Sequence, residues 1–185
     1  MRPSRIILRT TPKDELPSFT LKSVLEFGDK TSEGTLIECV ATPWFEIMRL
    51  IERDPNAIYE IDCWKWEEII AGAYKQAGFD EVELTPRSGD KGRDVVATKN
   101  GVGSIRIFDQ VKAYKPGNLV TANDVRAMAG IMSGANNVSK GVITTTSDFA
   151  PKIVEDEFIK PFIPHRIELR PREILLPWLK ELQDK

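Results

Sequence analysis

Histidine, cysteine and long hydrophobic runs are scarce in this chain of 185 residues. A single histidine, His165, excludes chemistry that needs a histidine pair, such as zinc hydrolysis on an H-E-x-x-H helix, and we expect it to be solvated or packed. The two cysteines, Cys39 and Cys63, fit no metal-ligand spacing, so we expect reduced thiols that serve packing. The apolar runs are only a few residues long, which predicts a cytoplasmic protein with neither a membrane span nor a signal peptide.

An overall excess of positive charge is also absent, because the formal net charge is −2. The basic residues are nevertheless concentrated locally: residues 86–115 hold 7 basic and 3 acidic side chains, while the rest of the chain sums to −6. A solvated charged hairpin is the ordinary explanation of such a segment, and a nucleic-acid contact is the functional one.

The order of the predicted elements indicates an α/β protein with two parts. Residues 1–58 contain two short β-rich segments, at 5–10 and 34–41, and a helix at 44–53 that Asp54-Pro55 ends, which predicts a small α+β unit of unknown role. Residues 59–185 form the larger part. Its predicted helices are 64–77, 123–135, 149–159 and 171–183, the first ended by Gly78 and the last bent at Pro177, and its predicted strands are 81–85, 93–98, 104–114, 140–146 and 166–170.

Strand 140–146 follows a helix of suitable length, so a right-handed crossover should place it parallel to strand 104–114. The expected sheet is therefore mixed, with helices on both faces.

The most informative stretch is RSGDKGRDVVATKNGVGSIRIFDQVKAY, residues 87–114. Its Asn-Gly turn folds the second strand back on the first, so Asp94 should lie opposite a residue between about 107 and 110. Gln110 and Lys112 are two residues apart and share one face of their strand, while Asp109 points to the other face. The hairpin therefore predicts that Asp94, Gln110 and Lys112 converge at one end of the sheet.

These three side chains suit hydrolysis assisted by a metal ion. Asp94 offers an anionic oxygen and Gln110 a neutral carbonyl oxygen, which are ligands that a hard cation such as Mg²⁺ accepts. Lys112 is placed to hold a scissile phosphate or to orient water. The structural alternative is an exposed strand with Asp94 capping a turn, and on this short pattern alone that alternative is favoured.

Several segments in the same order resemble the Mrr-type restriction endonuclease domain of the PD-(D/E)xK nuclease superfamily, over roughly residues 59–182. YEIDCWKWEEII resembles the opening helix of the family, with its aromatic-Glu pair at Trp66-Glu67 and its closing glycine eleven residues later. SGDKGRDVVA resembles the S-G-D-x-G-x-D motif, FDQVKAY the Q-x-K-x-Y variant of the E-x-K motif, and TTSDF the T-T-S-x-F strand end. Three residues depart from the usual pattern: Lys91 and Arg93 make the hairpin more basic, and Asp109 stands where a hydrophobic residue is common.

The resemblance implies a restriction-endonuclease-like fold, a three-layer αβα arrangement around a central mixed sheet. It also implies a Mg²⁺-dependent endodeoxyribonuclease, with Mn²⁺ as an alternative metal, that acts on DNA in restriction or defence against foreign or modified DNA. The implied catalytic residues are Asp94, Gln110, Lys112 and Glu67, of which Asp94, Gln110 and Glu67 are the metal ligands. We expect DNA contacts from a wider set whose members are otherwise ordinary surface charges or strand-end hydroxyls, namely Arg87, Lys91, Arg93, Lys115, Thr145 and Ser147.

Two other functions stay open at this point. One is a structure-selective nuclease of the Holliday-junction resolvase kind, which shares this core. The other is a DNA-binding module that keeps the nuclease fold without cleavage, because Gln110 carries less negative charge than a glutamate and would hold a metal less tightly. Cleavage of both strands would most simply need a homodimer.

Overall fold

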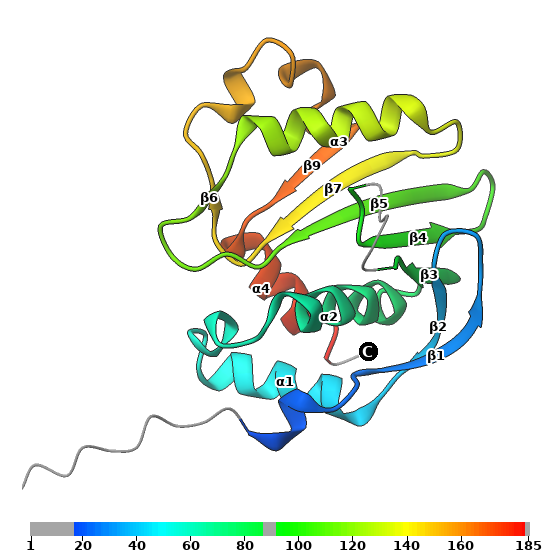
Figure 1. Ribbon diagram of the computed structural model, residues 1–185, viewed down its shortest axis with the longest axis vertical. Coiled ribbons are helices and arrows are strands. Elements are labelled where there is room, and N and C mark those ends of the chain that lie inside the picture. Colours follow the sequence, from blue (N-terminus) through cyan, green and yellow to red (C-terminus); the bar gives the residue numbers. More distant parts are fainter. Residues whose placement is uncertain (1–16, 87–91, 184–185) are drawn as a thin grey trace, which may run out of the picture.

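The computed structural model describes residues 17–86 and 92–183. Seven strands form one mixed sheet in the order β1-β2-β3-β4-β5-β7-β9 (Figure 1). Neighbours from β1 to β5 are antiparallel, and β5, β7 and β9 run parallel. The strands are β1 Leu25–Lys30, β2 Thr35–Val40, β3 Glu81–Leu84, β4 Val95–Lys99, β5 Ile105–Lys112, β7 Lys140–Thr145 and β9 Ile167–Arg170, and a separate parallel pair joins β6 Leu119–Val120 to β8 Asp148–Phe149.

Helices cover both faces of the large sheet. One face carries α1 (Thr42–Arg53), α2 (Cys63–Gln76) and α4 (Arg172–Glu181), and the opposite face carries α3 (Ala122–Gly134), as Figure 1 shows. Four short 3₁₀ turns complete the described elements, at Ser18–Leu21, Ala57–Tyr59, Ile153–Glu155 and Lys160–Phe162. The three-layer αβα fold with a central mixed sheet, predicted from the sequence, is confirmed. None of the helices in the described ranges combines the length and the apolar character that crossing a membrane requires.

Helix α2 forms where the apolar stripe predicts it. Asp62 caps its start, because its carboxylate accepts a hydrogen bond from the backbone N–H of Lys65 at 2.9 Å. Gly78 follows its end with φ +83°, a left-handed conformation that glycine adopts without a Cβ penalty. Trp66, Ile69, Ile70, Ala73 and Tyr74 are all buried, so the helix is fixed against the sheet along its whole length.

The crossover from β5 through α3 to β7 also follows the prediction. Strand β7 pairs in parallel with β5, and its register places Thr144 beside Val111 and Thr145 beside Lys112. Helix α3 begins at a capping box in which Thr121 and Asp124 bond reciprocally. This connection brings the start of α3 next to the end of β5, where the predicted catalytic lysine lies.

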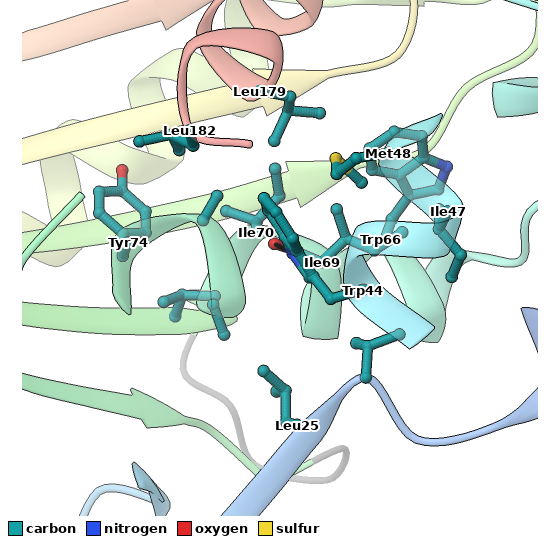
Figure 2. Packing of buried hydrophobic residues seen from close by; sticks show 14 of the residues in the cluster. Leu25, Trp44, Ile47, Met48, Trp66, Ile69, Ile70, Tyr74, Leu179 and Leu182 are labelled. Atoms are coloured by element: carbon teal, nitrogen blue, oxygen red, sulfur yellow. Dashed lines mark hydrogen bonds between the residues drawn. The ribbon is translucent and has the colours of Figure 1, made fainter. Parts of the chain in front are cut away.

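The N-terminal part of the chain belongs to the same sheet and the same core. Strand β2 pairs with β3, and Trp44 of α1 is fully buried with its indole Nε1 donating to the carbonyl oxygen of Ile69 on α2 at 3.0 Å. Figure 2 shows Leu25, Trp44 and Leu179 around Ile69 and its neighbours, so β1, α1 and α4 all pack on α2. The division of the chain at residue 58 stays a prediction, but within residues 17–86 it does not separate two hydrophobic cores.

The helix predicted at 149–159 is wrong. This segment begins with the last residue of β8, contains the 3₁₀ turn Ile153–Glu155, and is followed by a second 3₁₀ turn at Lys160–Phe162. Pro151 lacks a backbone donor, Lys152 adopts a left-handed conformation with φ 66°, and the Asp156 carboxylate accepts the backbone N–H of Phe158. These local features interrupt the backbone hydrogen bonding of a helix, and the spacing of apolar residues does not predict them.

The cysteines, His165 and the N-terminal strands were also the subject of predictions. Cys39 and Cys63 are free thiols, as expected, but both are exposed, so the packing role predicted for them is wrong. His165 is exposed and therefore solvated, one of the two expected alternatives. Strand β1 was not predicted, and the β-rich segment at 5–10 lies outside the described residues.

Replacement of Trp44 by alanine tests whether the N-terminal part shares the core. We expect Trp44→Ala to lower the free energy of unfolding by about 3–5 kcal/mol, because a buried indole leaves a large cavity. Urea denaturation followed by circular dichroism should show one transition that moves as a whole. A second transition that stays at the wild-type midpoint would instead make residues 1–58 a separate folding unit. Phe158→Ala, at a side chain that is 75% exposed, is the matched aromatic control and should shift the midpoint little.

Candidate active site

The β4–β5 hairpin places Asp94 at the strand segment that carries Gln110 and Lys112. Val95 pairs with Asp109, and the backbone N–H of Asp94 donates to the Asp109 carbonyl oxygen at 2.9 Å. Oδ2 of Asp94 accepts the backbone N–H of Val111 at 2.7 Å. The carboxylate is therefore held at the peptide that joins Gln110 to Val111, and the pairing of the two strands confirms the register predicted from the turn.

Gln110 and Lys112 face the α3 layer. Phe108, two residues before Gln110, belongs to the core beneath α3, whereas Ile107 and Val111 pack against the core beneath α2. Gly92 sits beside this face with φ +76°, where a Cβ atom would lie 2.6 Å from Cδ1 of Ile131 on α3. A larger residue at position 92 would be strained by the left-handed backbone and would require the end of the Ile131 side chain to move.

The amide oxygen of Gln110 is the most informative atom of the site. Oε1 is buried and accepts no hydrogen bond within the parts of the chain that the structure describes. A buried acceptor without a donor is unfavourable by about 1–3 kcal/mol. A cation bound beside it would remove that penalty, so the chemistry of this atom fits a metal ligand.

Both the backbone and the side chain of Lys112 contact neighbouring residues. Its backbone carbonyl accepts the Thr145 hydroxyl at 2.8 Å and the Thr146 backbone N–H at 3.3 Å. Its ammonium lies 3.5 Å from Oδ1 of Asp124 at the start of α3. The side chain is 23% exposed, so the ammonium is partly withdrawn from solvent on the same side of the sheet as Gln110.

Sequence reasoning missed Asp124. Burial raises the pKa of its carboxyl group, but the hydrogen bonds from Thr121 and the positive charge of Lys112 outweigh burial and hold the pKa below its ordinary value. The T-x-x-D pattern at residues 121–124 is visible in the sequence as a capping box. Its position next to Lys112 depends on how α3 packs over the end of β5, and the predicted order of the elements does not specify that packing.

The described residues fit a divalent metal only in part. Asp94 and Gln110 are near one another, but no cluster of three acidic, cysteine or histidine side chains suited to a metal occurs within residues 17–86 and 92–183. Glu67 is partly buried on α2, the helix that covers the opposite face of the sheet from Gln110. Its role as a ligand stays a prediction.

The residues predicted to contact DNA fall into different environments. Arg93 stacks over the Phe108 ring, 4.4 Å from its centroid, and lies 3.6 Å from Glu33, with its side chain only 12% exposed. The Thr145 hydroxyl donates a hydrogen bond to the Lys112 carbonyl oxygen, so it acts as an ordinary strand-end hydroxyl. A DNA contact from either side chain would require these interactions to rearrange.

Lys115 is better placed, whereas Ser147 is buried. Lys115 is exposed in the turn after β5. Ser147 follows β7 and lines a cavity of about 520 Å³ together with Tyr59 and Arg172. Arg87 and Lys91 lie outside the described residues, and all six DNA contacts stay predictions.

Asp109, on the other face of β5, is fully buried. Its Oδ2 accepts the Tyr74 hydroxyl at 2.7 Å and the Thr144 hydroxyl at 2.9 Å, and the Arg170 guanidinium lies 3.5 Å away. Burial raises its pKa to about 7, against the opposing effects of Arg170 and the two hydroxyl donors. A polar network therefore crosses the core directly behind Gln110.

Comparison with known proteins assigns the family. A family model described as restriction endonuclease, the Mrr catalytic domain, matches residues 58–176, nearly two thirds of the chain. The chain belongs to the Mrr-type restriction endonuclease family. The matched range contains Asp94, Gln110 and Lys112, and also Asp124. Its first residue lies next to the predicted boundary between residues 58 and 59.

Two solved structures resemble the chain. The DNA modification-dependent restriction endonuclease AspBHI shares 15% sequence identity at a TM-score of 0.48, over 77% of this chain and 36% of that one. The MspJI restriction endonuclease, solved in complex with a 27-mer oligonucleotide, shares 17% identity at a TM-score of 0.45, over 76% of this chain and 31% of that one. The chain thus spans about a third of the length of each. No curated protein matches the sequence.

The buried Asp109 predicts a specific dependence of stability on pH. Because its pKa rises from 3.8 to about 7 on folding, the folded protein retains this proton at pH values where the unfolded chain has lost it. The free energy of unfolding should therefore fall as the pH rises through this window and level off above it. Urea denaturation in EDTA should show that wild type loses stability relative to Asp109→Asn between about pH 4 and 7. Parallel pH profiles for the two proteins would contradict a raised pKa at Asp109.

Proposed function

We propose that this chain is a metal-dependent DNA endonuclease that hydrolyses phosphodiester bonds in restriction or defence against foreign or modified DNA. The observation that supports the proposal most directly is the buried amide oxygen of Gln110, which has no donor among the described residues. Asp94 accepts the backbone N–H of the next residue, Val111, and Lys112 lies two residues after Gln110 on the same strand. The restriction endonuclease family match supports the same reaction class.

The metal in this proposal is Mg²⁺, with Mn²⁺ as a substitute. Asp94 and Gln110 would hold it, with Glu67 as the third proposed protein ligand. A hard cation with few protein ligands keeps several waters, which suits a site that contributes one carboxylate and one amide oxygen from the hairpin. When bound, Mg²⁺ would stabilise the charge that develops on the phosphate and make water more acidic.

Lys112 would act on the substrate directly. Its ammonium carries three N–H donors, and the ion pair with Asp124 uses only one side of it. The remaining donors can hold a non-bridging oxygen of the scissile phosphate or orient the attacking water. Lys112 is the last residue of β5, so its charge lies at the carboxyl end of this strand, to which the proposal brings a DNA backbone.

DNA binding in this proposal depends on the positive charge of residues 86–115. The segment carries 7 basic and 3 acidic residues within a chain whose net charge is −2. Lys115 is exposed shortly after the end of β5, where it could contact a phosphate, and Ser147 could donate a hydrogen bond from the neighbouring strand end. Local rather than global charge would therefore steer DNA to the site.

Cleavage of supercoiled plasmid tests the function. We expect nicked or linear product with Mg²⁺, none in EDTA, and none from Lys112→Ala at an unchanged melting temperature, because a partly exposed lysine contributes little to packing.

Modified plasmid and a four-way junction should be assayed in parallel. Preferred cleavage of the junction would replace restriction with a resolvase-like activity. DNA binding without cleavage of any substrate would favour a non-catalytic module. Direct conversion to linear product would support two catalytic units acting together, as in a homodimer.

Gln110→Glu tests the metal ligand. The change places an anionic oxygen where the neutral amide oxygen lies, so the variant should cleave at least as fast as wild type and reach half-maximal rate at a lower Mg²⁺ concentration. Calorimetric titration with Mg²⁺ provides the binding measurement. Gln76→Glu, at the end of α2, adds the same charge away from the site and should leave both quantities unchanged. A folded Gln110→Glu protein that binds Mg²⁺ no better than wild type would remove Gln110 from the ligand set.

A further inference from the structure

We propose that Asp124 is a positioning residue that holds the Lys112 ammonium beside the metal site. The inference rests on the proposed function and adds to it a residue from α3, a helix that contributes no residue to the predicted catalytic set.

The two carboxylate oxygens of Asp124 have separate tasks. Oδ2 accepts the backbone N–H of Thr121 at 2.9 Å and the Thr121 hydroxyl at 2.7 Å, which completes the capping box of α3. Oδ1 is the atom that lies 3.5 Å from the Lys112 ammonium. The helix cap therefore fixes the carboxylate whether or not the lysine is present, and Asp124 is a rigid anchor for a flexible partner.

Lys112 needs such an anchor. Its backbone is held through the carbonyl by Thr145 and Thr146, but its side chain has four rotatable bonds beyond that point. Among the described residues, Asp124 is the sole acidic group in ion-pair contact with its ammonium. Both side chains are 23% exposed, so water screens their attraction less than it screens a pair on open surface.

The contact with Asp124 restrains the Lys112 side chain and leaves N–H donors of its ammonium available. At 3.5 Å the pair is longer than a strong charged hydrogen bond, which is typically about 2.7–2.9 Å. The ammonium can therefore turn its other donors toward a phosphate while staying near α3. Preorganisation of this kind matters because a misplacement of about 1 Å can lower a rate about 100-fold.

A pair of variants separates this role from helix capping. Glutamate and glutamine both serve at the third position of a capping box, so Asp124→Glu and Asp124→Gln preserve the cap and differ in one charge. We expect Asp124→Gln to lower the single-turnover cleavage rate at saturating DNA by at least about 10-fold, and Asp124→Glu to recover most of that loss. DNA binding in EDTA should be as tight as in wild type or tighter, because Asp124→Gln removes a negative charge near the phosphates.

Asp156→Asn is the matched control. Asp156 also pairs with a basic residue of α3, Arg126, and its side chain is similarly buried, but it does not contact Lys112. This variant should cleave at the wild-type rate. Equal rates for Asp124→Glu and Asp124→Gln, or an equal loss in Asp156→Asn, would overturn the proposal in favour of a purely structural contribution of α3.

A second measurement does not depend on cleavage. The ε-methylene resonance of Lys112, assigned by comparison with Lys112→Arg, should show restricted motion by NMR relaxation in wild type and in Asp124→Glu, and free motion in Asp124→Gln. Equal mobility in all three proteins would refute the positioning role. If wild type cleaves no DNA with Mg²⁺, the proposed function fails, while this comparison still decides whether Asp124 positions Lys112.

Discussion

The register of β5 is the constraint on which the rest of the site depends. This strand pairs antiparallel with β4 and parallel with β7, so two independent ladders fix it. Alternation along it sends Gln110 and Lys112 to the α3 face and Asp109 to the α2 face. A slip by one residue would exchange these faces, placing Asp109 beneath α3 and turning Lys112 into the core. The hairpin turn and the crossover thus set the chemistry before any side chain of the site makes a contact.

The polar network behind β5 makes such a slip more unfavourable. Asp109 is matched by Tyr74 from α2, Thr144 from β7 and Arg170 from β9, so its partners come from three elements that meet only in the native register. Arg170 also lies over the Trp178 ring, 4.1 Å from its centroid, which ties α4 to the same group. Buried ion pairs often contribute little net stability because desolvation offsets attraction. We infer that the value of Asp109 lies in specifying the alignment of β5 with its neighbours.

Sequence patterns predicted those parts of the structure that depend on local interactions. Helix α2 could be predicted from the sequence because its apolar stripe and Gly78 lie within one segment. The approach of Asp94 to Gln110 could be predicted because a short turn joins their strands. The pairing of Asp124 with Lys112 was not readable, since it depends on how α3 crosses back over the sheet. The helix expected at 149–159 failed for the opposite reason: its apolar spacing was helical, but Pro151 and the left-handed Lys152 interrupt the backbone. Long-range packing and backbone exceptions therefore mark the limits of the sequence patterns.

The charge balance of the site follows from these placements. If Gln110 is the second metal ligand, as proposed, Asp94 is the one carboxylate that the hairpin would offer, and the hairpin would place less negative charge beside a cation than it would with a glutamate at position 110. Asp124 is a carboxylate of α3, and its two oxygens contact Thr121 and the Lys112 ammonium. Its charge acts mainly on the lysine. In the proposed mechanism the two layers would have different roles: the β4–β5 hairpin would offer oxygens to the cation, and the start of α3 would hold the ammonium of Lys112 in place.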